Sequence, residues 1–211
     1  MEYPDLTELE GRSKRYWDVD GIPEFVMGSV FMLWGAAFVL RDLIPRGYRF
    51  AEACSWAIVV GLVISGWVAN WIIKVLKNKY TFPRAGYVKF LEPTRSKRLL
   101  YGFVGGLSAA AFAIVFVLSM KNRAIADLSG PAIGLIMACG FLVVSRRPGM
   151  HHFIWYSLFS LVLGAALYPL KLEWAATWWY FIGIGAAFAV GGACRLRAFV
   201  RSIPLPGGNE L

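Results

Sequence analysis

Residues 153–170 read FIWYSLFSLVLGAALYPL and contain no charged side chain. About 20 residues of helix cross a hydrocarbon core of roughly 30 Å, so an apolar run of this length is typical of a membrane span. Strands of a membrane barrel would alternate apolar with polar residues, and an open sheet could not satisfy its backbone in lipid. The stretch therefore predicts a transmembrane helix.

Five similar runs lie elsewhere in the chain. Of the 211 residues, 58% are hydrophobic, and the mean hydropathy is +0.55, whereas soluble domains are roughly 45 to 50% apolar. The run at 128–144 has Gly130 and Pro131 near its start, and we expect it to be short, tilted or locally broken. The pattern predicts an all-α integral membrane bundle of six transmembrane helices. The apolar runs are 23–40, 54–73, 99–120, 128–144, 153–170 and 174–194.

The Lys and Arg residues gather on one predicted side of the membrane. Cytoplasmic loops of membrane proteins collect these residues. The two tails and the second and fourth loops hold sixteen of the 22, and the other loops hold six. Both termini are therefore predicted to be cytoplasmic. The predicted parts are a tail at 1–22, a six-helix domain at 23–195 with a basic cytoplasmic loop at 74–98, and a second tail at 196–211.

The core of the basic loop, KNKYTFPRAGYVKFLEPTRSKR at 77–98, carries seven Lys or Arg and four aromatic residues. Cations near anionic lipid gain about 1 kcal/mol each, and aromatic rings favour headgroup depth. Pro83 and Gly86 are expected to break any helix there. We expect the loop to lie on the cytoplasmic leaflet, where the predicted lipid or phosphate contacts are Lys79, Arg84, Tyr87, Lys89, Arg95, Lys97 and Arg98.

Two alternatives for this loop compete with simple contact with the membrane surface. One is a shaped pocket for a phosphate-bearing lipid or ligand around Lys79, Arg84 and Lys89. The other is nucleic acid, which the net charge of +9 could suggest. No recognition fold for nucleic acid fits between two spans, so we expect no nucleic-acid partner.

Acidic residues stand where the first helix is expected to begin. Asp20 and Glu24 suit helix capping and the positive end of the helix dipole. Cation binding or proton exchange that also involves Asp18 is the alternative. The acids could pair with Arg84 or Lys89 of the loop and with the end of the last helix. The predicted ion network at the cytoplasmic rim comprises Asp18, Asp20, Glu24, Arg195 and Arg197.

Small residues recur every four positions in two of the runs. Membrane helices approach closely where such residues meet, so the two stripes predict contacts within the bundle, with a homodimer face as the alternative. The stripe in 99–120 comprises Gly102, Gly106 and Ala110. The stripe in 174–194 comprises Gly183, Ala187 and Gly191, with Gly185, Ala189 and Ala193 beside it.

The sequence contains none of the motifs that would indicate catalysis, a metal or a cofactor. The three cysteines fit no zinc or iron–sulfur spacing, and the adjacent His151 and His152 cannot ligate haem from facing positions. Hydrolase elbows, metalloprotease motifs and phosphate-binding loops are missing from the sequence. Asn70, the only amide within the apolar runs, is expected to bond between helices. We therefore predict no catalytic residue, no metal and no cofactor.

Three segments resemble an uncharacterised group of small bacterial polytopic membrane proteins. They read RYWDVDGIPEF at 15–25, TFPRAGYVKF at 81–90 and RAFVRSIPLP at 197–206. In that group the cytoplasmic loop reads close to T-Y-P-R-T-G-Y-V, and here Phe82 and Ala85 replace the usual Tyr and Thr. The resemblance implies a six-helix protein of the bacterial inner membrane, and it implies no activity or cofactor.

These observations favour a non-catalytic accessory or interaction subunit that contacts anionic lipid and that could act as a homodimer or in a larger membrane complex. A small transporter or channel would require a polar cavity, and a lipid-modifying enzyme would require a headgroup-sized pocket. The cavity would be lined by Asn70, Ser108, Ser119, Ser157 and Ser160. The pocket would be formed by Arg84, His151 and His152.

Overall fold

The computed structural model describes residues 20–45, 49–85, 122–147 and 149–202, with scattered helical residues between 99 and 118. All the regular structure in these residues is helical, as the sequence predicts. The elements are α2 (Ile22–Asp42), α3 (Arg49–Leu76), a π-helical turn (Lys77–Thr81), α4 (Phe82–Ala85), α6 (Arg123–Asp127), α7 (Ser129–Ser145), α8 (Phe153–Leu167), a 3₁₀ turn (Tyr168–Leu170) and α9 (Ala175–Ser202).

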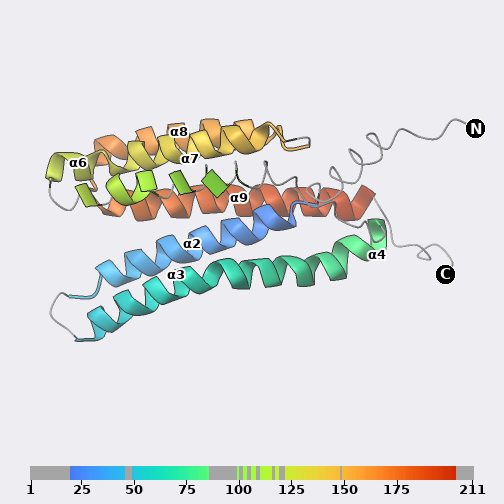
Figure 1. Cartoon of the computed structure of the whole chain (residues 1–211), viewed down its shortest axis with the longest axis horizontal. Coiled ribbons are helices and arrows are strands. Elements are labelled where there is room, and N and C mark those ends of the chain that lie inside the picture. Colours follow the sequence, from blue (N-terminus) through green and yellow to red (C-terminus); the bar gives the residue numbers. More distant parts are fainter. Residues whose placement is uncertain are drawn as a thin grey trace, which may run out of the picture.

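The long helices lie side by side along one axis (Figure 1). α7 and α8 form a hairpin on one side of α9, α2 packs on another side of α9, and α3 lies outside α2. Contacts between helix ends define the two ends of the bundle. The Glu24 end holds the start of α2, the end of α3, the start of α8 and the end of α9. The Asp42 end holds the end of α2, α6 and the start of α9.

Three helices in the described part of the chain are long and apolar enough to cross a membrane, namely Ile22–Asp42, Phe153–Leu170 and Ala175–Ser202. α7 is apolar but has only 17 residues. This agrees with the expectation that the run at 128–144 forms a short helix. Six spans remain a prediction, because residues 99–120 are described only in part.

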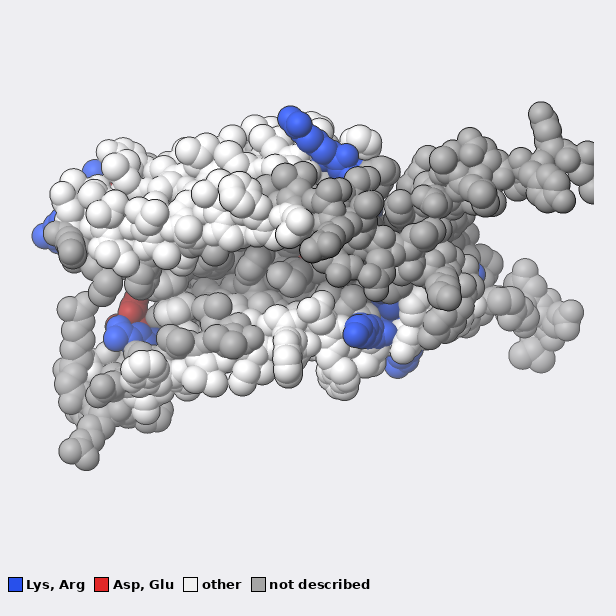
Figure 2. All heavy atoms as spheres, viewed as in Figure 1, with Lys and Arg blue, Asp and Glu red and all other residues white. Residues whose placement is uncertain are grey.

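The sides of the helices expose large apolar residues. The exposed fraction is 69% for Leu33, 85% for Trp67 and 71% for Trp155. The charged side chains visible in Figure 2 fall into groups that are separated along the long axis, one of them at its left end, and the described surface between the groups is uncharged. An apolar surface of this extent is suited to lipid rather than water. These features are those of a multi-pass membrane protein.

Glycines allow α2 and α9 to approach backbone to backbone. A Cβ added to Gly28 would lie 2.3 Å from the backbone nitrogen of Ala189, and one added to Gly185 would lie 2.7 Å from the carbonyl oxygen of Gly28. Gly21 has a φ of 68°, and a Cβ there would lie 2.5 Å from the carbonyl oxygen of Gly192. The closest backbone contact of α9 therefore uses the row of small residues beside the stripe that the sequence favoured.

The favoured stripe of α9 faces side chains instead of a backbone. A Cβ on Gly183 would lie 2.8 Å from Leu163, and one on Gly191 would meet the hydroxyl of Tyr156, so both glycines make room for α8. Gly102, Gly106 and Ala110 are exposed. No atom of the described residues lies within 4 Å of a Cβ built on Gly102 or Gly106. The helix contact predicted for that stripe is not found within the described part of the chain.

Two helices extend beyond the boundaries that the sequence suggested. α3 leads through the π-helical turn and α4 to Ala85, so Pro83 does not end the helical segment. The backbone N–H of Phe82 donates to the carbonyl of Lys77, five residues earlier, in the manner of a π helix. α9 continues to Ser202, although we expected a tail from residue 196. The wider π turn just before Pro83 is one way for a helix to accommodate the missing N–H of proline.

Candidate functional site

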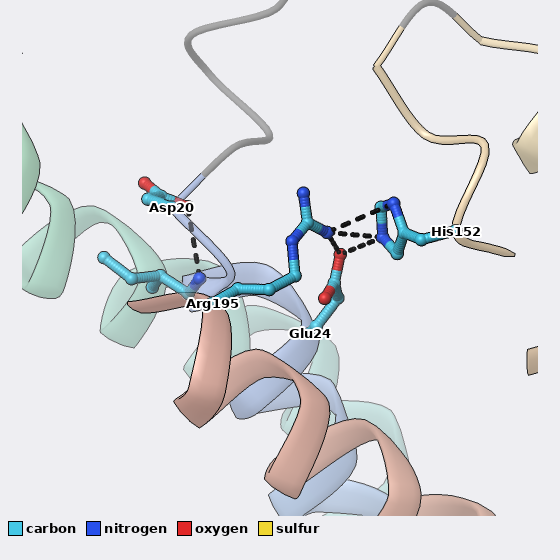
Figure 3. Close-up of polar contacts among 5 residues, drawn as sticks. Asp20, Glu24, His152 and Arg195 are labelled. Carbon is cyan, nitrogen blue, oxygen red and sulfur yellow. Dashed lines mark hydrogen bonds and ion pairs between the residues drawn. The ribbon is translucent and has the colours of Figure 1, made fainter. Parts of the chain in front are cut away.

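Buried charges gather at the Glu24 end of the bundle (Figure 3). Among the described residues, the buried charged side chains are Asp20, Glu24 and Lys77, with exposed fractions of 0%, 6% and 0%. Lys, Asp and Glu are almost never buried unless they are paired. Their partners therefore show which elements these buried charges connect.

Asp20 joins the start of α2 to the end of α3. Its Oδ1 accepts a hydrogen bond from the backbone N–H of Ile22 at 3.1 Å, which satisfies one of the unpaired donors of the first helical turn. Its Oδ2 accepts from the Thr81 hydroxyl at 2.8 Å and lies 3.5 Å from the Nζ of Lys77. Lys77 and Thr81 are the first and last residues of the π turn, which therefore directs both side chains toward one carboxylate.

Glu24 joins α2 to α8 and α9. Its Oε1 lies 2.5 Å from the Nη1 of Arg195 and 2.7 Å from the Nε2 of His152. Arg195 Nη1 also contacts Nε2 of His152, so three polar atoms from three elements meet. The second carboxylate oxygen, Oε2, is buried and has no hydrogen-bond partner among the described residues.

The local sequence explains why these three side chains meet. Gly21 and Gly192 bring the start of α2 against α9, and a Cβ on Gly21 would lie 2.8 Å from the Cβ of Arg195. Glu24 lies in the first turn of α2, where the helix dipole favours a carboxylate. His152 is the residue before α8. The imidazole therefore reaches Glu24 from a turn, whereas Arg195 reaches it from within a helix.

The distance from this cluster to the polar contact at the Asp42 end can be estimated along α9. At the Asp42 end, Trp178 Nε1 donates to Oδ2 of Asp42 at 3.0 Å. Arg195 lies seventeen residues further along α9, which at about 1.5 Å per residue is roughly 26 Å. A hydrocarbon core is about 30 Å thick. The two polar layers are thus separated by about the thickness of one membrane core.

The structure brings together part of the ion network expected from the sequence. Glu24 and Arg195 pair directly, and Asp20 acts in part as the expected cap. Arg197 is exposed. Arg84 donates to the carbonyl of Tyr80 at 2.9 Å, and the expected pairing of Arg84 or Lys89 with an acid stays a prediction, because Asp18 and Lys89 lie outside the described residues.

Several of the predicted residues lie outside the described part of the chain. Of the ion network, Asp18 cannot be placed. Of the lipid contacts, Lys79 is exposed and Arg84 is half-buried. The others that fall outside the described residues are Tyr87, Lys89, Arg95, Lys97 and Arg98.

Sequence reasoning did not assign Lys77, Thr81 and His152 to the network. All three were on the predicted cytoplasmic side, and Lys77 and Thr81 are four residues apart, so a shared face could have been proposed. Nothing local indicated that His152 rather than His151 would reach Glu24. That choice depends on how the α7–α8 hairpin docks onto α9.

The two alternative functions receive little support from the described contacts. Ser157 and Ser160 are buried, but they donate to the carbonyls of Ala138 and Gly134 and so connect α8 to α7. Asn70, which we expected to bond between helices, has an exposed side chain. These three residues therefore do not face one polar cavity, and Ser108 and Ser119 lie outside the described residues.

The pocket expected of a lipid-modifying enzyme is not assembled by the described contacts either. His152 bonds to Glu24 and Arg195, whereas Arg84 bonds to the backbone of Tyr80. His151 is exposed.

The Asp42 end is built from exposed ion pairs. Arg41 lies 3.1 Å from Asp42 on the same helix. Arg123 Nε donates a hydrogen bond to Oε1 of Glu173 at 2.5 Å, and this bond raises the pKa of the Arg123 guanidinium. Lys171 lies 3.5 Å from Asp127. The cations described at this end are therefore balanced by acids.

Comparisons with known proteins do not extend this description. No protein-family model matches the chain, and the searches of curated proteins and of solved structures gave no similar protein. Within the described residues, no group of three or more His, Cys, Asp or Glu side chains is placed to hold a metal ion. What can be assigned is the class: an all-helical protein with at least three helices suited to spanning a membrane.

Proposed function

We propose that the protein is a non-catalytic accessory or interaction subunit of a membrane, and that it contacts anionic lipid with the Glu24 end of its bundle. In this proposal the chain crosses the bacterial inner membrane six times and keeps both tails in the cytoplasm. It acts as a homodimer or within a larger membrane complex. The resemblance of residues 15–25, 81–90 and 197–206 to a group of small bacterial membrane proteins supports the same arrangement.

The observation that carries the proposal is the unequal charge of the two ends. Among the residues whose side chains are described, three cations face three acids at the Asp42 end. At the Glu24 end, nine described cations accompany two acids, and both acids are buried and paired. The nine cations are Lys74, Lys77, Lys79, Arg84, Arg146, Arg147, Arg195, Arg197 and Arg201.

The surplus cations at the Glu24 end are mostly on the surface, where a lipid headgroup could reach them. Lys74, Lys79, Arg146, Arg197 and Arg201 are all exposed. Each cation close to an anionic leaflet contributes about 1 kcal/mol of attraction at moderate ionic strength. In this proposal the four cations expected to contact lipid in 86–98, namely Lys89, Arg95, Lys97 and Arg98, contribute to the same contact.

A pair of triple variants tests the proposal with the number of removed charges held equal. The first is Arg146→Gln, Arg197→Gln and Arg201→Gln at the Glu24 end. The second is Arg41→Gln, Arg123→Gln and Lys171→Gln at the Asp42 end. Both are extracted from membranes in mild detergent, and the retained phosphatidylglycerol is measured relative to phosphatidylethanolamine.

We expect the first variant to lose at least half of its phosphatidylglycerol and the second to retain the wild-type ratio. The reason is that only the cations of the Glu24 end exceed the neighbouring acids. Equal retention by the two variants would contradict the proposal. A loss from the Asp42-end variant alone would assign the lipid contact to the opposite end.

A further inference from the structure

One amide side chain is exposed on the outside of the bundle within a predicted span. Asn70 lies on α3 in the uncharged run 54–73, and its side chain is exposed. It makes no hydrogen bond to any residue that the structure describes. The serines of the other spans differ, since Ser29, Ser157 and Ser160 donate to carbonyls of the helices. The described bundle therefore supplies no partner for the Asn70 amide.

The position of Asn70 on α3 places its amide inside the hydrocarbon core of the proposed membrane arrangement. A helix over 54–73 is about 30 Å long, which matches the thickness of the core. Asn70 is three residues from the end of this run, which is about 5 Å along the helix axis. Side chains of a helix tilt toward its N-terminus, and α3 begins at the Asp42 end. The amide therefore tilts deeper into the core, away from the nearer headgroups.

A carboxamide at this depth can gain hydrogen bonds only from another molecule in the core. Lipid tails offer none, and amide side chains of membrane helices bond across helix contacts. A carboxamide carries both an acceptor oxygen and N–H donors, so two asparagines can satisfy each other. Two copies of one chain share their orientation in the membrane, and a two-fold axis along the membrane normal brings the same residue to the same depth. A second copy therefore supplies the matching group.

We propose that the exposed face of α3 around Asn70 is the interface at which two copies of the chain pair, with the two Asn70 amides bonded to each other across a two-fold axis. This inference rests on the proposed function, because it takes the six-span homodimer named there and assigns the surface that forms it. The lipid contact of the Glu24 end uses other residues and is tested separately.

The rest of this face is free to pack against its symmetry mate. Trp56, Val60 and Trp67 are exposed, and their spacing of four and seven residues, followed by Asn70 three residues later, keeps all four on one side of the helix. In Figure 1, α3 lies at the outer edge of the described helices, and α2 packs on its inner side. Lys74 is one turn nearer the Glu24 end, where its long side chain can reach headgroups. A second α3 can therefore pack along this face without displacing a described helix.

Cross-linking in membranes locates the interface directly. Two copies of the full chain with different tags are co-expressed after alanine has replaced the native cysteines, which are Cys54, Cys139 and Cys194. Trp67→Cys places a thiol beside Asn70 on α3. Trp155→Cys is the matched control on α8, since both tryptophans are exposed, by 85% and 71%. We expect oxidation to join differently tagged copies through Trp67→Cys and not through Trp155→Cys.

A second measurement isolates the amide. Labelled copies of the full chain are reconstituted in liposomes of phosphatidylethanolamine and phosphatidylglycerol, and energy transfer on dilution with lipid gives the dimer affinity. Asn70→Leu should lower the affinity about tenfold, because the reciprocal hydrogen bonds are lost, whereas Asn70→Gln keeps an amide and should stay within about threefold. The cross-linking variants retain Asn70, so that comparison stays decisive whatever Asn70→Leu does to folding.

Each outcome bears on the inference and on the proposed function differently. Absence of cross-linking through Trp67→Cys, or equal cross-linking through Trp155→Cys, would overturn the inference. If energy transfer still shows a dimer, the homodimer of the proposed function stands on another face. A monomer at every dilution would overturn both, while the retained phosphatidylglycerol would still decide the lipid contact. Wild-type affinity in Asn70→Leu would also overturn the inference, because the amides would not pair.

Discussion

The two ends of the bundle use the same kinds of charged residues in different ways. At the Asp42 end, the Lys171–Asp127 and Arg123–Glu173 pairs are on the surface, with exposed fractions of 59% for Lys171 and 85% for Arg123. At the Glu24 end, Asp20 and Lys77 are both completely buried. Water can replace either partner of an exposed pair, whereas a buried charge that loses its partner stays unpaired. Burial, and not the number of ion pairs, therefore separates the two ends.

The largest effect should come from breaking the buried pair. Lys77→Met leaves the Asp20 carboxylate buried without its cation, and we expect a loss of about 3 to 5 kcal/mol in the free energy of unfolding. Lys171→Met removes an exposed partner of Asp127 and should cost at most about 1 kcal/mol. Denaturant unfolding in detergent micelles compares the two variants. Equal losses would remove the distinction between the two ends.

The second-largest effect should come from separating α2 from α9, whose close contact we expect to hold the two ends in place. Gly28→Ala would put a Cβ 2.3 Å from a backbone nitrogen of α9, so the helices must separate at a cost of about 1 to 3 kcal/mol. Gly66→Ala is the matched control, because no described atom lies within 4 Å of its Cβ. Alanine favours helix over glycine by up to about 1 kcal/mol. Thermal unfolding should therefore show a lower midpoint for the first variant only.

The smallest effect should come from removing the hydrogen bond between Trp178 and Asp42 at the Asp42 end. Trp178→Phe removes the hydrogen bond to Asp42 but keeps a ring that can stack on Phe38, whose centroid lies 3.9 Å away. The side chain of Asp42 is 43% exposed and can be hydrated. We therefore expect a loss of about 1 kcal/mol. A loss as large as that of Lys77→Met would show that both ends depend equally on buried polar contacts.

Much of the helical architecture follows from composition. The apolar run at 23–40 corresponds to α2, the run at 153–170 to α8 with its 3₁₀ turn, and the run at 174–194 to α9. Long segments without charge favour helix in lipid. The end of α9 could not be placed in this way. Arg195, Arg197 and Arg201 suggested a tail, but good helix formers continue the helix beyond the apolar segment.

The candidate site was predictable only in part. Charge near the start of α2 and the end of α9 suggested that Glu24 and Arg195 would meet, because both belong to the predicted cytoplasmic side. His152 is 128 residues from Glu24 along the chain, and no local pattern relates the two. The small-residue stripes were ambiguous for a similar reason, since Gly183 and Gly185 both lie on faces that could have met α2.

By itself, the sequence determined which segments are helical and apolar and how the charges divide between the two ends. Both depend on the transfer of each segment between water and an apolar medium, which is a property of its own side chains. Only the tertiary structure decided which carboxylate meets which cation and which of two adjacent histidines joins them. Those choices depend on the packing of α2, α8 and α9, where a distance of one ångström separates a hydrogen bond from no bond.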